Sequence, residues 1–231
     1  MLESTTTYCF RCLLPNNRLL SRLEDTRVVA LHTDGNDEDS SDSENEKMSR
    51  EHGFIYVTRL HFMHEADLRN YHAWGLDGDA GFADSREMGI DHLLNAGQIA
   101  SGLAVRKLPD VGGVNVGYGL FADSGMASGG FIAEYVGVLY AKRHTAPSAY
   151  SMFYPSYDGA YEVDAAEYGN VCRFVNHSST RSNAAYKHVL HEGVVHVVCI
   201  AIADIAPAEQ ILVDYGASYW HARGIQPVDL S

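Results

Sequence analysis

The 231-residue sequence predicts a mainly β protein assembled from several small sheets, with few short helices. From residue 103 onward the apolar runs are short and irregularly spaced. Such runs suit the strands of a clip or small barrel, whereas a parallel α/β sheet would alternate strands with long helical patterns. Apolar residues make up 46% of the chain and charged residues 20%, which is sufficient for a packed core.

The first hundred residues divide by composition into three stretches. Residues 1–33 are an N-terminal segment of unassigned role, and residues 51–102 are a flanking region with a strand-like run at 54–62. Between them, residues 34–50 are acidic: positions 34–47 hold seven acidic side chains, three serines, one lysine and no apolar residue. We expect a solvated loop or linker there, with an acidic clamp or a phosphorylation-tuned switch as alternatives.

Residues 103–217 are expected to form one domain, followed by a helix and tail at 218–231. Its predicted strands lie at 119–122, 131–139, 161–164, 184–190, 194–203 and 210–214. The fourth and fifth strands flank Glu192-Gly193 and read as a hairpin, and the fifth is apolar on both faces, as in a buried central strand. A short helix is expected at 218–223.

The net charge restricts the partners of the protein. The sequence has 17 basic and 30 acidic side chains, for a formal charge of −13. Direct nucleic-acid binding needs a basic surface, so we expect none, and a basic, lysine-containing protein or peptide is electrostatically favoured instead. No run of 18 apolar residues predicts a membrane helix, and four cysteines favour a reduced, intracellular setting.

Three clusters combine residue types that bind ligands. The first is Gly117-Tyr118-Gly119 at the start of a strand, where glycines allow the backbone to approach a ligand closely. The second runs from Gly169 to Ser179 and sets Asn176-His177 beside Arg173. The third ends in Asp214-Tyr215-Gly216, with Trp220 nearby. Taken singly, each also fits an ordinary explanation: a tight turn, a satisfied polar turn, or a core aromatic with an exposed tip.

In this order and at these spacings, the clusters together resemble the SET domain of protein lysine methyltransferases. The residues that carry the resemblance are Gly117-Tyr118-Gly119-Leu120-Phe121-Ala122, Glu134-Tyr135-Val136-Gly137, Asp164-Ala165, Gly169-Asn170, Arg173 through Ser178, and Asp214-Tyr215-Gly216. The similarity spans about residues 103–220, and nothing before residue 100 contributes to it.

The resemblance implies a β-clip SET fold in which the C-terminal segment threads under a preceding loop as a pseudoknot. It implies an enzyme that transfers methyl groups from S-adenosylmethionine to the ε-amine of lysine in a protein, with a histone tail as one candidate substrate. Catalytic roles fall on Tyr215 and Tyr150. Cofactor-binding roles fall on Gly117, Tyr118, Gly119, Arg173, Asn176, His177 and Trp220.

Other expectations rest on what the sequence lacks. There is no C-terminal Cys-x-Cys cluster, and Cys9-x-x-Cys12 has no second pair at ligand spacing, so we expect no metal site. The sequence has no basic localisation run that would decide between the nucleus and the cytoplasm. A nuclear location is expected from the family resemblance alone. The main alternative is a catalytically inactive SET- or PR-like module that binds a protein partner. A scaffold organised by the acidic loop is a weaker third reading, since it leaves the ordered motifs unexplained.

Overall fold

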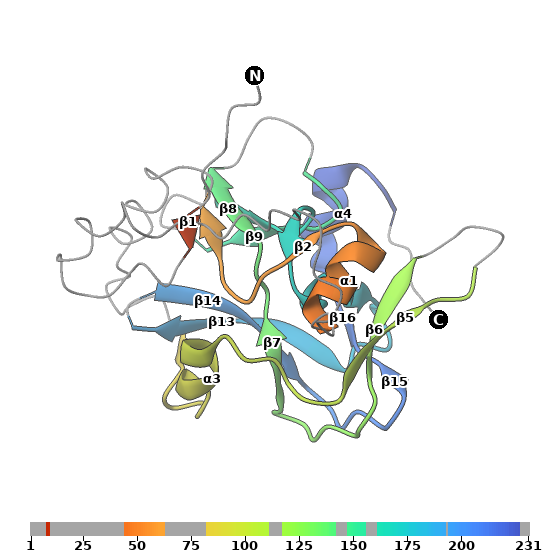
Figure 1. Cartoon of the computed structure of the whole chain (residues 1–231), viewed down its shortest axis with the longest axis horizontal. Helices are drawn as coiled ribbons and strands as arrows, with labels where there is room; N and C mark the ends of the chain where they lie inside the picture. The colour runs from red at the N-terminus through yellow and green to blue at the C-terminus, as the bar shows by residue number, and fades with distance from the viewer. Residues whose placement is uncertain are drawn as a thin grey trace, which may run out of the picture.

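The computed structural model describes residues 8–9, 44–62, 82–110, 117–141, 147–155, 161–192 and 194–226. Within them the chain folds as several short-stranded sheets with few short helices (Figure 1), which confirms the predicted fold class. The predictions for residues 1–33, apart from β1 (Tyr8–Cys9), and for 34–43 lie outside the described residues.

The largest sheet is organised around the predicted hairpin. Its strand order is β12-β16-β13-β14-β7, and β4 pairs additionally with β13. The strands are β12 (Asn176–His177), β16 (Leu212–Val213), β13 (Ala184–His191), β14 (Val194–Ala201), β7 (Phe131–Glu134) and β4 (Ala83–Asp84). All eight residues of β14 are buried, which confirms that the apolar run is a central strand.

Three smaller sheets make up the rest of the β structure in the part of the chain that the structure describes. One has the order β1-β3-β8-β10-β9, another β15-β6-β5, and a third pairs β11 with β2 in parallel. Their strands are β3 (His61–Phe62), β8 (Val138–Ala141), β10 (Tyr161–Asp164), β9 (Ser151–Tyr154), β15 (Glu209–Gln210), β6 (Tyr118–Ala122), β5 (Leu103–Lys107), β11 (Tyr168–Gly169) and β2 (Ile55–Tyr56).

Two predicted strands are divided in the structure. The run at 131–139 becomes β7 and β8, which belong to different sheets, and the turn between them brings Gly137 against β10. A Cβ at Gly137 would lie 2.2 Å from the carbonyl oxygen of Asp164, so the close approach depends on glycine. The run at 54–62 likewise becomes β2 and β3, in separate sheets.

Among the described residues the helices are α1 (Glu44–His52), α3 (Asp91–Ala96), α4 (Gly216–Arg223) and the 3₁₀ helix η2 (Val171–Phe174). Helix α4 confirms the helix expected at 218–223. Helix α1 corrects the acidic loop predicted for 34–50, because positions 44–50 are helical. Met48 of α1 packs against the core, and Ser49 accepts a hydrogen bond from the Tyr56 amide at 2.9 Å, so tertiary contacts outweigh the polar composition.

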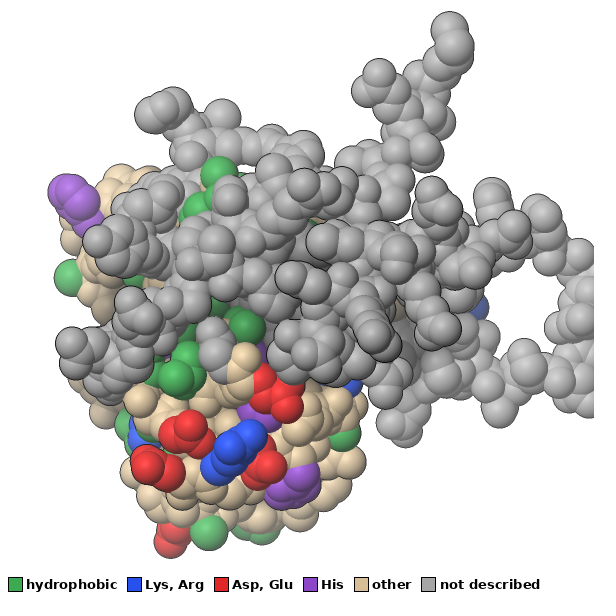
Figure 2. Space-filling view, turned by 90° about the vertical axis from the view of Figure 1, so that its left-hand side faces the viewer, with side chains coloured by type: hydrophobic (Ala, Val, Ile, Leu, Met, Phe, Trp, Pro, Cys, Tyr) green, Lys and Arg blue, Asp and Glu red, His purple; other side chains and the backbone are tan. Residues whose placement is uncertain are grey.

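The flanking region and the predicted domain share one hydrophobic core. Phe54, Leu60 and Phe62 are buried in the same cluster as Val163 and Ile211. Where Figure 2 shows described residues in colour, acidic side chains lie interspersed with basic and histidine side chains.

The C-terminal segment crosses the structure between two neighbouring strands. β16 lies between β12 and β13, which are joined only by residues 178–183. The Ser178 amide donates to the Val213 carbonyl and the Asn183 amide to the Leu212 carbonyl, each at 3.0 Å. The chain therefore threads beneath this loop, as the pseudoknot prediction requires.

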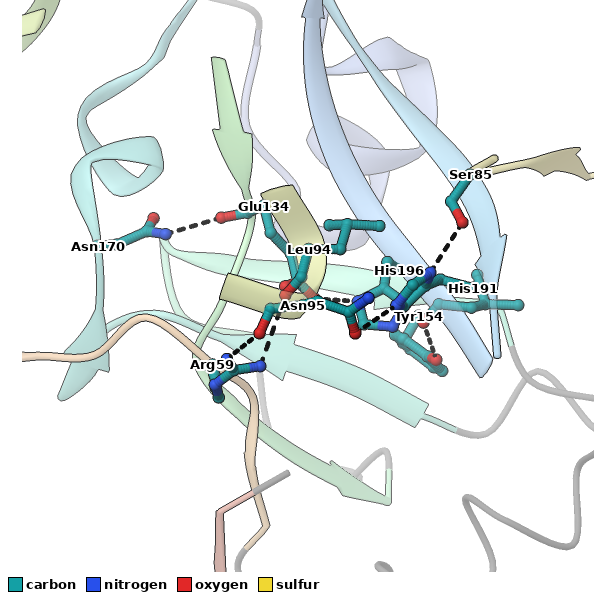
Figure 3. A network of polar contacts seen from close by, with 10 residues as sticks. Arg59, Ser85, Leu94, Asn95, Glu134, Tyr154, Asn170, His191 and His196 are labelled. Atoms are coloured by element: carbon teal, nitrogen blue, oxygen red, sulfur yellow. Dashed lines mark hydrogen bonds and ion pairs between the residues drawn. The ribbon is translucent and has the colours of Figure 1, made fainter. Parts of the chain in front are cut away.

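A buried polar network ties β4 and α3 to the hairpin (Figure 3). His191 contacts Ser85 Oγ through Nδ1 at 2.8 Å and Asn95 Oδ1 through Nε2 at 3.1 Å. His196 pairs with Glu134 at 2.7 Å. Burial lowers the pKa of His191, and the nearby His196 lowers it further. The neutral ring can donate to Asn95 and accept from Ser85 at once, whereas the protonated ring cannot accept.

Replacing Asn183 by alanine tests whether its side-chain hydrogen bonds stabilise the threaded segment around β16. Its side chain accepts from the Leu212 amide at 2.9 Å and donates to the Gln210 carbonyl at 2.8 Å. Leaving these buried groups unpaired should lower the free energy of unfolding by about 3 kcal/mol, measured by urea denaturation. Arg181→Ala, in the same loop but exposed, should change it by less than about 0.5 kcal/mol. Equal effects of the two changes would contradict the role of Asn183.

Acidification should destabilise the protein. Burial lowers the pKa values of His52, His61, His188 and His191 in the folded state. The unfolded chain therefore takes up protons below about pH 6.5 that the folded chain does not, and stability is lost as the pH falls. The unfolding free energy should be lower at pH 5.5 than at pH 7.5.

In His191→Gln the difference in unfolding free energy between pH 7.5 and pH 5.5 should shrink by about 1 kcal/mol. The variant lacks one of the histidines that take up a proton on unfolding. His92→Gln, at an exposed position of α3, should behave as the wild type. Parallel pH profiles for the wild type and His191→Gln would show that His191 does not contribute.

Candidate functional site

The crossing brings the three sequence clusters together. β12 carries Asn176 and His177, and its neighbour β16 leads directly into Tyr215. The Asn176 side chain donates to the Tyr118 carbonyl at 2.9 Å, which connects β12 to the glycine-rich start of β6. The Tyr215 amide donates to His177 Nδ1 at 3.1 Å. Segments that lie 58 and 38 positions apart in the chain are thus joined by single hydrogen bonds.

Tyr215 stands at the N-terminus of α4 with its hydroxyl turned into the protein. The hydroxyl donates to the Val175 carbonyl at 2.7 Å. Burial raises the pKa of Tyr215 above its ordinary value, and the neighbouring Tyr219 and Tyr150 add to this shift, while Arg223 opposes it. The hydroxyl therefore stays protonated at neutral pH, and because its proton is donated to Val175, its oxygen faces a ligand as a hydrogen-bond acceptor.

Aromatic rings surround Tyr215. The ring centroid of Tyr219 lies 4.5 Å away, that of His177 5.3 Å and that of Trp220 5.9 Å. Trp220 also meets His177 edge to face at 4.9 Å. The predicted site residues Tyr215, His177 and Trp220 therefore form one aromatic cluster.

Tyr150 and Arg173 lie together on an adjoining part of the site. The Arg173 guanidinium lies 4.2 Å from the ring centroids of both Tyr150 and Phe54. It also donates to the carbonyls of Ala165 at 3.0 Å and Ala166 at 3.2 Å. These contacts give Arg173 a structural role that the sequence did not reveal, and its predicted contact with a cofactor stays a prediction.

The two glycines of the segment 117–119 have different surroundings. Gly117 has φ +80°, in the left-handed region that favours glycine. A Cβ at Gly119 would lie 2.5 Å from Gln210 Nε2. The Tyr118 ring is partly exposed and packs edge-on at 4.3 Å against His52, the last residue of α1. Gly119 therefore leaves room for the Gln210 side chain of β15, and the Tyr118 ring connects the segment to the end of α1.

Buried nitrogens without partners gather around these same residues. Within the described part of the chain, His52 Nδ1, His177 Nε2, Gln210 Nε2 and Trp220 Nε1 have no hydrogen-bond partner. Because His177 Nδ1 accepts from Tyr215, the neutral ring carries its proton on Nε2. Each unpaired buried polar atom costs about 1–3 kcal/mol, so a polar ligand that pairs with any of these nitrogens is favoured.

Several residues of the site were not found by sequence reasoning. His52, Gln210, Tyr219 and Arg223 all contact predicted site residues or their neighbours. The four-residue spacing of Tyr219 and Arg223 within a predicted helix places them on one face, which is a signal that could have linked them. Nothing in the local sequence links His52 to Tyr118, 66 positions later.

Comparison with known proteins identifies the domain. Residues 117–216 match the family model of the SET domain. The chain contains a SET domain. The SET domain thus includes most of the predicted site, with Trp220 just beyond its matched end.

Three curated relatives match part of this chain. The H3 lysine-9 specific histone-lysine N-methyltransferase of Schizosaccharomyces pombe is 38% identical over 71 residues, covering 29% of this chain and 14% of that protein. Histone-lysine N-methyltransferase Su(var)3-9 of Drosophila melanogaster is 29% identical over 115 residues, covering 43% and 18%. N-lysine methyltransferase KMT5A-B of Xenopus laevis is 29% identical over 142 residues, covering 56% and 40%. The matches therefore span less than half of each relative.

Solved structures show the same fold. The crystal structure of ATXR5 in complex with histone H3.1 mono-methylated on R26 has a TM-score of 0.60 at 18% identity, covering 74% of this chain and 85% of that one. This likeness reaches beyond residues 117–216 and includes part of the flanking sequence. Within the described residues there is no group of three or more His, Cys, Asp or Glu side chains arranged for a metal ion, and no helix long and apolar enough to span a bilayer.

Proposed function

We propose that this protein is an S-adenosylmethionine-dependent protein lysine methyltransferase. The observation that carries the proposal is the inward-turned Tyr215 hydroxyl at the crossing, surrounded by aromatic rings and by buried nitrogens that lack partners. The SET-domain match and relatives named as lysine methyltransferases support it.

The residues present fit the proposed cofactor. The segment Gly117-Tyr118-Gly119 is open to close approach at Gly117, where a Cβ would meet nothing within 4 Å, and within the described residues His177 Nε2 and Trp220 Nε1 are buried nitrogens without partners. We assign the binding of S-adenosylmethionine to these residues and to Asn176, with Arg173 supporting the site through Tyr150. When bound, the cofactor supplies a methyl group activated by a sulfonium.

The aromatic side chains would prepare the substrate amine. An ε-amine can accept a methyl group only in its neutral form, and apolar walls lower the pKa of a lysine by desolvating its charged form. We assign this role to Tyr150, Tyr215 and Tyr219. The Tyr215 hydroxyl, held protonated and fixed by the Val175 carbonyl, would orient the amine, since in-line transfer depends strongly on positioning.

The proposed substrate is a basic, lysine-containing segment of a protein, and a histone tail is the foremost candidate. The net charge of −13 favours such a partner over nucleic acid, and the names of the relatives refer to histones. A nuclear location follows from this substrate. We place the catalytic domain at 103–217, with residues 54–62 contributing to its core.

The alternative is an inactive SET-like module that binds a protein partner. The retained Asn176-His177 pair and the buried Tyr215 hydroxyl favour the enzyme. A calorimetric titration with S-adenosylmethionine separates the two: saturable binding is expected for the enzyme and none for the module.

Tyr215→Phe should abolish most of the turnover and leave cofactor binding nearly intact. Removing one oriented hydroxyl from a reacting centre costs about 100-fold or more in rate, while the cofactor affinity should stay within about threefold. Turnover is measured with labelled S-adenosylmethionine on an array of lysine peptides, and affinity by calorimetry. Tyr154→Phe is the matched control, because it removes a buried hydroxyl that donates to the Val195 carbonyl outside the site. Unchanged turnover in Tyr215→Phe would refute the catalytic assignment.

Asn176→Ala should weaken the cofactor first. The change removes the hydrogen bond to the Tyr118 carbonyl and loosens the glycine segment. Loss of about 1.4 kcal/mol corresponds to tenfold weaker binding of S-adenosylmethionine, measured by calorimetry. Asn95→Ala removes an asparagine bonded to His191, outside the site, and should keep the wild-type affinity. Equal affinities for the wild type and Asn176→Ala would contradict the assignment.

A further inference from the structure

Arg223, in the last turn of α4, connects this helix to the stretch that precedes and begins β9. Its Nε donates to the Ser148 carbonyl at 3.2 Å, and Nη2 donates to the Ser151 carbonyl at 2.8 Å and to Ser151 Oγ at 3.2 Å. Nη2 also donates to the Ser148 carbonyl. One guanidinium thus bonds both ends of the four-residue stretch 148–151.

Tyr219 strengthens the same connection one turn earlier in the helix. Its hydroxyl donates to the Ala149 carbonyl at 2.9 Å. The Arg223 guanidinium lies 3.7 Å from the centroid of the Tyr219 ring and donates through Nη1 to the Tyr219 carbonyl at 3.1 Å. We name these two side chains, Tyr219 and Arg223, the α4 clamp.

The α4 clamp joins the two tyrosines assigned to catalysis. Tyr215 precedes the first residue of α4, and Tyr150 lies inside the stretch 148–151 that the α4 clamp bonds. An eight-residue helix is short and stiff, so fixing its last turn to this stretch fixes the position of Tyr150 relative to Tyr215. Tyr150 is also held by its own carbonyl, which accepts from the Tyr135 hydroxyl at 2.6 Å.

We propose that Arg223 is a positioning residue that sets the separation between Tyr150 and Tyr215, and thereby the fit of the substrate lysine between them. The proposal rests on the proposed methyltransferase function. A guanidinium is required because its fixed planar fork reaches the two carbonyls and the Tyr219 ring at once, whereas the point charge of lysine does not.

The test compares Arg223→Ala and Arg223→Lys with Arg86→Ala, a control at an exposed arginine distant in sequence from both tyrosines. Misplacement of a reacting group by about 1 Å costs on the order of 100-fold in rate. We therefore expect kcat to fall by about 100-fold in Arg223→Ala, with the affinity for S-adenosylmethionine within about threefold of wild type. Arg223→Lys should recover little of the rate, and added methylguanidinium should restore part of it in Arg223→Ala.

A second readout does not depend on activity. Hydrogen exchange followed by mass spectrometry should show faster exchange at residues 148–154 in both Arg223 variants and wild-type exchange in Arg86→Ala. If the wild type is active, either of two results overturns the positioning role alone. One is a wild-type kcat in Arg223→Ala. The other is a loss of cofactor affinity in Arg223→Ala that matches its loss of kcat. A wild-type protein that binds no cofactor and transfers no methyl group overturns the proposed function and the positioning role with it.

Discussion

The insertion of β16 between β12 and β13 is the constraint on which the site depends. Two short strands, each of two residues, place His177 beside Val213 and continue directly into the Tyr215 backbone. Asn183 secures the crossing because its side chain bonds the chain on both sides of Ile211. Threading is entropically unfavourable and rare in proteins, so the fully buried Ile211, Leu212 and Val213 must contribute enough apolar burial to offset it.

Residues of the flanking region also support the site. Phe54 packs against Phe174 and beneath the Arg173 guanidinium, and the Ile55 and Val57 amides donate to the Glu167 and Gly169 carbonyls. These contacts fix the segment that leads into Asn176 and His177. Residues 54–62 gave no sequence signal of function, yet Phe54, Leu60 and Phe62 belong to the same hydrophobic core as the SET domain.

Much of the fold could be predicted because its signals are local. The hairpin at β13 and β14 follows from apolar runs around Glu192-Gly193, and β10 has the predicted bounds. Other features depend on contacts between distant residues. The break near Gly137 arises from its approach to Asp164, and α1 from docking on the core. The site was predicted through spaced motifs, but His52 and Arg223 act through partners 66 and 72–75 positions away, which no local pattern encodes.

The central claim is that the crossing unites three separate segments into one cofactor site. Hydrogen exchange with and without S-adenosylhomocysteine, the product form of the cofactor, tests it most directly. The account predicts slower exchange on binding in residues 117–122, 173–178 and 213–220 together, and unchanged exchange at residues 83–96. Protection confined to one of the three segments, or no protection at saturating ligand, would contradict it.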